Sequence, residues 1–229
     1  MKIIGIVCIH NRNYAIGYNN KLLFTLKKDM QFFKQTTIHT DDSEKKNAVL
    51  MGYNTYKSIP TKYFPLEKRI NIIISNHHYK EIKKHIKESL LTNVFVFRNI
   101  LNAIHFCNVQ NTIETLFVIG GSSIYGFFIK HYLFEEMYIT HISKPDIEIG
   151  NVFLPNKQNI ELNFIRHLIQ IYTEKQCKNH VDQETYDVTY SIYLSLIHIS
   201  EPTRRTPISY AVFSLKKLTG PLTRPHSVF

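Results

Sequence analysis

The 229-residue sequence contains no tryptophan, and its three cysteines, Cys8, Cys107 and Cys177, are widely separated. Three thiols cannot build the disulfide framework of a small secreted domain, and their spacing matches no metal site. We therefore expect reduced cysteines, a cytoplasmic location and no bound metal.

Long hydrophobic runs are also absent. No apolar stretch approaches the roughly 20 residues of a membrane span. The first residues, MKIIGIVCIHNRN, carry one lysine and a short apolar run that His10, Asn11 and Arg12 interrupt, which does not resemble a secretory signal. The sequence predicts a protein without membrane association.

Acidic residues are scarce, with 18 Asp and Glu against 28 Lys and Arg. Of the resulting net charge of +10, a share of +4 falls within residues 195–229. The other basic residues form no run with interleaved aromatics, and KEIKKHIKES is typical of a solvated helix face. Because the positive charge is not gathered into a docking surface, we expect that nucleic acid is an unlikely partner.

Five short, β-branched apolar runs are typical of strands buried on both faces of a sheet. They cover residues 2–9, 47–51, 69–75, 93–97 and 115–119, and helical or mixed segments follow at 25–36, 53–59, 79–90, 99–107 and 122–132. This alternation predicts an α/β protein with a mostly parallel sheet. Three later runs, 136–142, 163–172 and 186–194, predict antiparallel strands at its end.

Composition changes near residue 195, because residues 195–229 hold four of the eight prolines and show no periodicity. We therefore divide the chain into a folded domain, 1–194, and a disordered or non-native tail, 195–229. The tail resembles peptides produced when adapter or vector nucleotides are translated in frame. A native interaction tail is the alternative.

One carboxylate stands among residues that should be buried. In LLFTLKKDMQFFK, residues 22–34, a helix would place Leu26, Met30 and Phe33 on the same face as Asp29. A buried charge is costly unless it is paired, so Asp29 could face a ligand. Alternatively, it stabilises the first turn of a helix that Thr25 caps.

Two predicted strands end in glycine. LFVIGGSSIYGFF runs into Gly120 and Gly121 before a polar helix start, and VLMGYNTYKSI ends at Gly52. Backbone N–H groups at such turns are open to an anion such as a phosphate. Because open α/β sheets bind ligands beyond the carboxyl ends of their strands, the two turns could hold one dinucleotide.

In this order and at these separations, the motifs IGYNNKLLFTLKKDMQFFK, NAVLMGYNTYKSIP, RINIIIS, LFVIGGSSIY and MYITHI resemble the dihydrofolate reductase family. The resemblance extends from residue 2 to about 194. It implies one α/β domain with a mostly parallel eight-stranded sheet, an antiparallel C-terminal strand and flanking helices. It also implies reduction of 7,8-dihydrofolate to 5,6,7,8-tetrahydrofolate by hydride transfer from NADPH, in support of one-carbon and thymidylate synthesis.

The resemblance also implies the substrate site. Asp29 would accept the amidine-like donor pair of the pterin, and Thr140 would hydrogen-bond Asp29 and its water. Arg69 would hold the α-carboxylate of the glutamyl tail, for which its planar fork is suited. The other implied contacts are the backbone carbonyls of Val7 and Ile119 and the side chains of Met30, Phe33 and Ile59.

The implied cofactor site lies at the two glycine turns. Ile16 and Tyr125 would pack around the nicotinamide, and residues 120–124 would hold the pyrophosphate. The full implied set is Ile16, Gly17, Gly52, Asn54, Thr55, Ser75, Asn76, Gly120, Gly121, Ser122, Ser123, Ile124 and Tyr125.

Several residues depart from the family pattern. Leu23 and Phe24 replace a usual Pro-Trp pair, which removes an indole donor near the pterin. Tyr53 replaces the arginine that meets the 2′-phosphate of NADPH, so Lys57, Ser75, Asn76 or His77 would have to compensate. Ser123 stands where some members carry arginine. Asn151 replaces the usual acid that positions a mobile loop.

Two other functions compete with this prediction. A pyrimidine reductase of riboflavin synthesis would share the sheet and cofactor, but it should lack the first-helix carboxylate, so Asp29 with Phe33 argues against it. A non-catalytic, basic protein of similar fold would fit the charge and the missing tryptophan. For all three functions we expect a monomer.

Overall fold

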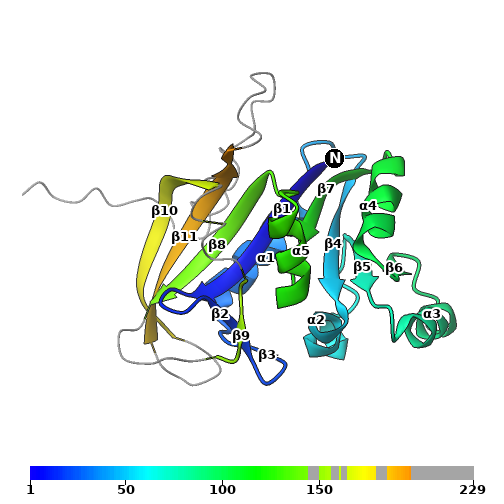
Figure 1. Cartoon of the computed structure of the whole chain (residues 1–229), viewed down its shortest axis with the longest axis horizontal. Coiled ribbons are helices and arrows are strands. Elements are labelled where there is room, and N and C mark those ends of the chain that lie inside the picture. The colour runs from blue at the N-terminus through cyan, green and yellow to red at the C-terminus, as the bar shows by residue number, and fades with distance from the viewer. Residues whose placement is uncertain (144–149, 156–159, 161–163, 179–184, 197–229) are drawn as a thin grey trace, which may run out of the picture.

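A computed structural model describes residues 1–143, 150–155, 160, 164–178 and 185–196. Its centre is an eight-stranded sheet with the order β10-β11-β8-β1-β7-β4-β5-β6 (Figure 1). The strands of this sheet are β1 (Lys2–His10), β4 (Lys46–Gly52), β5 (Ile70–Ile74), β6 (Val94–Phe97), β7 (Ile113–Val118), β8 (Glu136–Ser143), β10 (Phe164–Lys178) and β11 (Thr185–Ser195).

Every neighbouring pair from β8 to β6 is parallel, whereas β11 is antiparallel to both β8 and β10. Seven strands therefore run in one direction and only β11 runs against them. This confirms the predicted mostly parallel, eight-stranded sheet with an antiparallel C-terminal strand.

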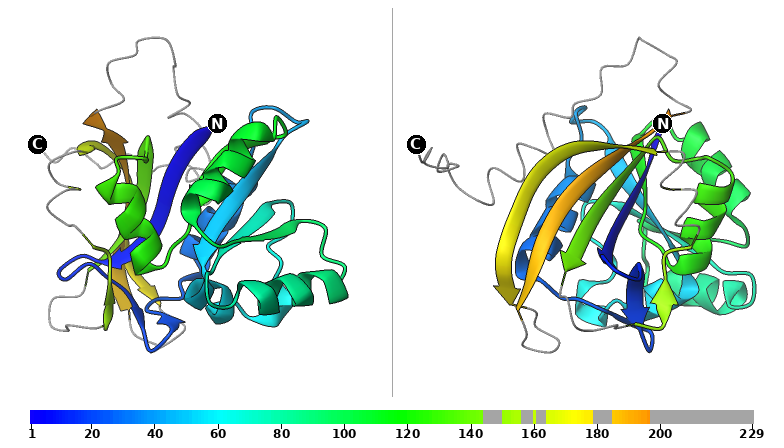
Figure 2. Two further views of the ribbon diagram at one scale, coloured as in Figure 1. Left: turned by 45° about the vertical axis from the view of Figure 1, so that its right-hand side comes forward. Right: turned by 60° about the vertical axis from the view of Figure 1, so that its left-hand side comes forward.

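Two apolar cores form because alternate side chains of a strand point to opposite faces of the sheet. On one face, Leu50 and Leu116 pack with helices α4 (Ile100–Val109) and α5 (Ser122–Lys130). On the other face, Val49 and Met51 pack with α1 (Lys27–Ile38) and α3 (Tyr79–Glu88). Figure 2 shows the helices on both sides of the sheet.

Short elements complete the fold. Helix α2 (Tyr53–Ser58) and a 3₁₀ turn, η1 (Thr61–Tyr63), follow β4. A second sheet has the order β3-β2-β9, from β2 (Ala15–Tyr18), β3 (Lys21–Leu22) and β9 (Val152–Phe153). The sequence did not predict this sheet, because strands of two to four residues are too short to show a periodic pattern.

The first helix differs from its prediction at its start and on its buried face. Leu26, not Thr25, is the N-cap residue, and Met30 is 39% exposed. Phe32 is the buried aromatic, with its ring against Tyr190 at a centroid distance of 5.3 Å. The prediction that Met30 shares a buried face with Leu26 was therefore wrong, because the sheet lies against the face that carries Phe32.

The C-terminal strand extends slightly beyond the predicted domain boundary. β11 includes Ser195, which is 3% exposed. The Ser195 N–H donates a hydrogen bond to the Glu135 carbonyl. Residues 197–229, which make up nearly all of the predicted tail, lie outside the described residues. Within the described ranges, no helix is long and apolar enough to cross a membrane.

We expect Phe134→Ala to lower the free energy of unfolding by about 3–5 kcal/mol. Phe134 is fully buried and stacks on Phe128 at 5.2 Å, so its removal leaves a cavity that its neighbours cannot fill. Urea titration followed by circular dichroism measures the change. Leu101→Ala, on the exposed side of α4, is the control and should change stability by less than about 0.5 kcal/mol. Equal effects would contradict the assigned core.

Candidate active site

Helix α1 directs Asp29 towards strand β8. The Thr140 hydroxyl donates a hydrogen bond of 2.7 Å to Asp29 Oδ1. The helix carries Asp29 in its first turn, which also favours a negative charge through the helix dipole. Among the described residues, Asp29 Oδ2 has no hydrogen-bond partner, so this oxygen is available to a ligand.

The environment of Asp29 disfavours its charge. Burial raises the pKa of Asp29 from 3.8 to about 6, and the Thr140 hydrogen bond opposes this rise. Cys8 on β1 is the Cα partner of Thr140, and burial together with the Asp29 charge raises the pKa of the Cys8 thiol well above its usual value. The sequence analysis did not identify Cys8 as a site residue. Its place opposite Thr140 depends on the strand register.

Arg69 is buried, at 4% exposure, immediately before β5. Its Nη1 donates to Thr37 Oγ1 at 2.7 Å, and its Nε donates to the Glu67 carbonyl at 3.0 Å. The guanidinium lies 5.8 Å from the centroid of the Phe33 ring. Burial lowers the pKa of Arg69 to about 10, which still leaves it charged at neutral pH. Within the described chain, no carboxylate forms an ion pair with it.

Asp29, Phe33 and Thr37 form a stripe along α1, because residues four apart share a helix face. At a rise of about 1.5 Å per residue, the stripe extends for about 12 Å. It places a carboxylate at one end, an aromatic ring in the middle and the Thr37–Arg69 pair at the other end. The sequence indicated Asp29 and Phe33 but missed Thr37, although Thr37 continues the same spacing.

The remaining expected substrate residues lie around this stripe. Ile59, which ends α2, and Ile119, which follows β7, pack with Phe33 against the same core. Val7 is buried in β1 and is the Cα partner of Ile139 on β8. Met30 projects into solvent from α1.

The two glycine turns are in direct contact. The Gly52 N–H donates to the Gly120 carbonyl at 2.7 Å. Gly120 has a φ of +99°, and a Cβ there would lie 2.6 Å from the Tyr125 ring, so this position requires glycine. At Gly121, a Cβ would meet only Thr55 Oγ1, at 3.4 Å. The backbone before α5 is therefore open to an anion, as a phosphate of NADPH requires.

Below this turn, Tyr125 and Ile124 are buried in α5. The Tyr125 hydroxyl donates to the Ile6 carbonyl at 2.7 Å, and burial raises the pKa of this phenol. Ile124 lies against Gly52, where a Cβ would approach it to 3.1 Å. Both side chains thus fix α5 against β1 and β4. The cofactor contacts expected of Ile124 and Tyr125 would be made where α5 meets these two strands.

Other expected cofactor residues lie in three places, on β2, α2 and α5. Ile16 and Gly17 lie in β2, where Ile16 packs against the core and Gly17 pairs with Leu22 and Val152. Asn54 is exposed near the start of α2. Ser122 and Ser123 are the first two residues of α5. The Ser122 hydroxyl donates to the Phe153 carbonyl at 2.7 Å, whereas the Ser123 hydroxyl has no partner among the described residues.

A row of residues follows β4, β5 and β6. Gly52, Ile74 and Phe97 are Cα partners across these strands, so Tyr53, Ser75 and Arg98 leave the sheet side by side. Tyr53 stacks on His78 at a centroid distance of 3.8 Å, and the Ser75 hydroxyl accepts from the His78 N–H at 3.0 Å.

Arg98 is the cation of this row. Its Nη1 lies 3.3 Å from both the carbonyl and the side-chain oxygen of Asn76. Lys57, Ser75, Asn76 and His77 were predicted as substitutes for the missing arginine, and Arg98 was not. The available signal was its position directly after the strand run NVFVF.

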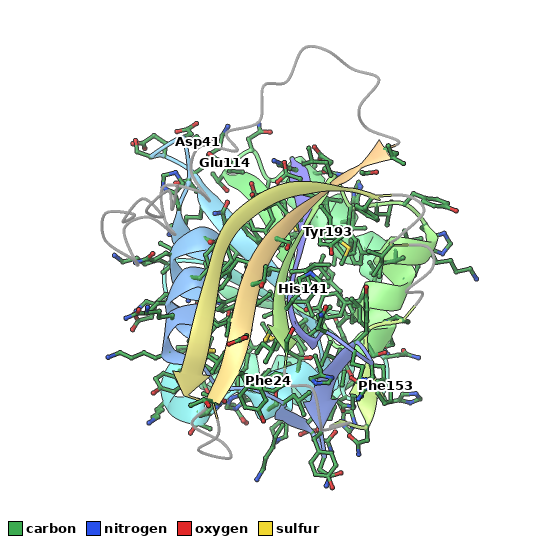
Figure 3. The ribbon with its side chains drawn as sticks, turned by 90° about the vertical axis from the view of Figure 1, so that its left-hand side faces the viewer. Phe24, Asp41, Glu114, His141, Phe153 and Tyr193 are labelled. Carbon is green, nitrogen blue, oxygen red and sulfur yellow. The ribbon has the colours of Figure 1, made fainter. Side chains whose placement is uncertain are left out.

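Phe24 is buried at the end of the molecule where Phe153 also lies, away from Asp41 and Glu114 (Figure 3). Its ring stacks on His10 at 6.3 Å and meets Tyr186 edge-on at 5.1 Å. A phenylalanine therefore fills this position through aromatic packing alone, since it has no N–H to donate.

A mostly parallel sheet with glycine turns at its carboxyl edge is typical of α/β proteins that bind a dinucleotide. The family model described as dihydrofolate reductase matches residues 3–194, and the chain therefore belongs to the dihydrofolate reductase family.

Curated relatives carry the same name. The chain is 35% identical to dihydrofolate reductase of Heliothis virescens over 170 residues, which cover 74% of this chain and 87% of that protein. It is 34% identical to dihydrofolate reductase of Candida albicans, over 58% of this chain and 65% of that protein. For dihydrofolate reductase of Saccharomyces cerevisiae the identity is 36%, over 54% and 57%.

The family reaction is the reduction of 7,8-dihydrofolate to 5,6,7,8-tetrahydrofolate, a step of one-carbon metabolism with NADPH as hydride donor. This chain is accordingly an NADPH-dependent oxidoreductase of that activity.

We expect Asp29→Asn to lower turnover more than roughly tenfold at neutral pH, because an amide accepts through one oxygen only and carries no charge. Steady-state kinetics on folded protein measure this loss. Normal turnover would contradict the importance of the carboxylate.

The same substitution should alter the pH dependence of stability. The folded-state pKa of about 6 exceeds the ordinary 3.8, so the native state binds more protons between these values and loses stability as pH rises through them. The amide side chain cannot ionise, so Asp29→Asn should be more stable at pH 7, by about 3 kcal/mol at most. Urea titrations at pH 4 and pH 7 measure the difference, which should fall below about 1 kcal/mol at pH 4, close to the ordinary pKa of 3.8.

Proposed function

We propose that the α1 stripe and Arg69 bind dihydrofolate along its length, with Asp29 on the pterin and Arg69 on the glutamyl α-carboxylate. The observation that carries this proposal is the pair of partly desolvated, opposite charges at the two ends of the stripe. Each lacks an ionic partner within the described chain, and a buried charge is costly unless something pairs with it. Phe33 between them suits the flat pterin and benzoyl groups.

Asp29 and Thr140 are the proposed catalytic residues. The Asp29 carboxylate accepts hydrogen bonds from the amino group and the adjacent ring N–H of the pterin, which fixes the ring orientation. Thr140 holds Oδ1 by its hydrogen bond, so the carboxylate has one orientation rather than several. The raised pKa of Asp29 keeps it within reach of protonation near neutral pH, which suits a group that promotes proton delivery to N5 through water.

The proposed cofactor site comprises the two glycine turns with Thr55, Ser123 and the start of α5. NADPH supplies the hydride when it is bound there. The open backbone at Gly121 supports a pyrophosphate at this helix start, and Ile16 and Gly17 on β2 lie on the nicotinamide side. Three residues near Tyr53 take the place of the missing arginine towards the 2′-phosphate, namely Ser75, Asn76 and Arg98.

We also infer a monomeric, cytoplasmic protein that does not bind nucleic acid. Cys8 and Cys107 are free thiols, as a reducing compartment favours. Among the described residues, exposed large apolar side chains occur singly at Leu90, Leu101 and Val109, which does not suggest a subunit interface on those elements.

The test of this function is dihydrofolate-dependent oxidation of NADPH, together with tight binding of an antifolate that carries a 2,4-diaminopyrimidine ring. The diaminopyrimidine presents a pair of donors from which Asp29 can accept hydrogen bonds. We therefore expect both NADPH oxidation and antifolate binding. Their joint absence in folded protein would contradict the proposal. It would favour a non-catalytic protein, whereas reduction of a ribityl-phosphate pyrimidine would favour the riboflavin-pathway enzyme.

Arg69→Lys should raise the KM for dihydrofolate by roughly tenfold or more and leave kcat nearly unchanged, because lysine keeps the charge but lacks the planar fork. A dihydropterin without the glutamyl group provides the control, since its kinetics do not depend on a carboxylate contact. An equal loss with both substrates would show that Arg69 acts by supporting the fold instead.

A further inference from the structure

The segment 150–155, which contains β9, lies between the two halves of the proposed cofactor site. On one side it pairs with β2, where Ala15 is the partner of Phe153 and Gly17 the partner of Val152. On the other side, the Ser122 hydroxyl at the start of α5 donates to the Phe153 carbonyl at 2.7 Å. β2 carries the residues proposed for the nicotinamide, and α5 begins at the proposed pyrophosphate position.

The attachment of this segment to β2 is extensive. The Asn151 N–H donates to the Gly17 carbonyl at 3.1 Å, and the Leu154 N–H donates to the Tyr14 carbonyl at 2.8 Å. The side chains of Asn19 and Asn151 also pair, since Asn151 Nδ2 donates to Asn19 Oδ1 at 2.9 Å and Asn151 Oδ1 accepts from the Asn19 N–H at 3.1 Å. The position of β2 is therefore tied to the position of β9.

The segment also contacts α5, and Leu154 is buried in the apolar core to which Ile124 and Phe128 belong. Apart from the Ser122 hydrogen bond, Pro155 lies so close to Gly126 that a Cβ there would approach Pro155 Cγ to 3.1 Å. Ser122 thus provides a polar contact between β9 and the helix whose start faces the cofactor.

A hydroxyl has a single proton to donate, and phosphate oxygens are acceptors. Ser122 already donates that proton to Phe153, so it cannot donate to a phosphate without breaking this bond. Ser123 is exposed in the next position, and its hydroxyl has no partner among the described residues. Two adjacent serines at one helix start therefore have different functions.

We propose that Ser122 is a positioning residue, which fixes β9 and, through it, the β2 residues Ile16 and Gly17 at the nicotinamide end of the cofactor. Ser123 instead donates directly to the pyrophosphate. This inference rests on the proposed cofactor site and adds a division of labour within it.

The test compares Ser122→Ala with Ser123→Ala for two ligands, measured by titration calorimetry. The ligands are NADPH and 2′-phospho-ADP-ribose, which retains the pyrophosphate and the 2′-phosphate but lacks the nicotinamide. Ser122→Ala should weaken NADPH by about fivefold, the size expected for the loss of one hydrogen bond, and leave 2′-phospho-ADP-ribose within twofold. Ser123→Ala should weaken both ligands by the same factor.

Hydrogen exchange provides a readout without ligand. The N–H groups of Asn151 and Leu154 should exchange faster in Ser122→Ala but not in Ser123→Ala, because only the first loosens β9. Ser122→Thr retains a hydroxyl and should restore both the NADPH affinity and the slow exchange. Asn151→Ala loosens the other side of β9 and should reproduce the selective loss of NADPH affinity.

Each outcome distinguishes the alternatives. Equal weakening of both ligands by Ser122→Ala would overturn the inference in favour of a direct phosphate contact, and no change in either would show that Ser122 does not position β2. If the unaltered, folded chain bound neither ligand, the proposed cofactor site itself would be wrong, which is a separate result from a failure of Ser122→Ala alone.

Discussion

The hydrogen bond from the Gly52 N–H to the Gly120 carbonyl joins the ends of β4 and β7, and the arrangement of the site depends on this junction. It fixes the start of α2 against the turn before α5, so that Thr55 and Gly121 face each other. The parallel register then carries the alignment outward, to Tyr53, Ser75 and Arg98 on one side. Because parallel strands end at one edge, these separate sequence segments form one surface.

A second constraint is the cost of two partly desolvated charges, one half-buried at Asp29 and one buried at Arg69. Asp29 and Arg69 both have pKa values shifted towards their neutral forms, which means that the fold opposes their ionisation. Thr140 and Thr37 offset part of this cost through one hydrogen bond each. In the proposed complex, donors on the pterin and the glutamyl carboxylate would remove the remaining cost, so these side chains would contribute to binding at the expense of stability.

The sequence predicted the main sheet and its helices well because long β-branched runs and glycine endings are strong local signals. It also singled out Asp29 as a candidate ligand-binding residue, because a carboxylate among apolar residues conflicts with their burial. It could not predict which face of α1 packs on the sheet, and Met30, which is 39% exposed, was therefore expected to be buried. Cys8 and Arg98 were missed because register with a neighbouring strand places them, whereas Thr37 was missed although it continues the four-residue spacing of Asp29 and Phe33. The small sheet of β2, β3 and β9 joins segments more than 100 residues apart, a pairing that no local pattern indicates.

The departures from the family pattern share a physical character. At Phe24 and Tyr53 the aromatic packing is retained, against Tyr186 and His78 respectively, but the polar contribution of the usual residue is lost. Packing depends on volume and shape, which these side chains supply, whereas a hydrogen bond or a charge requires a particular atom. Arg98 shows that a charge lost from one strand end can be present at a neighbouring one, since the parallel register places both in the same row. Phe24 has no polar atom, so the donor of the usual indole has no counterpart in this side chain. Strand register can therefore keep a cation near the strand end that lost it, whereas aromatic packing at Phe24 restores no donor.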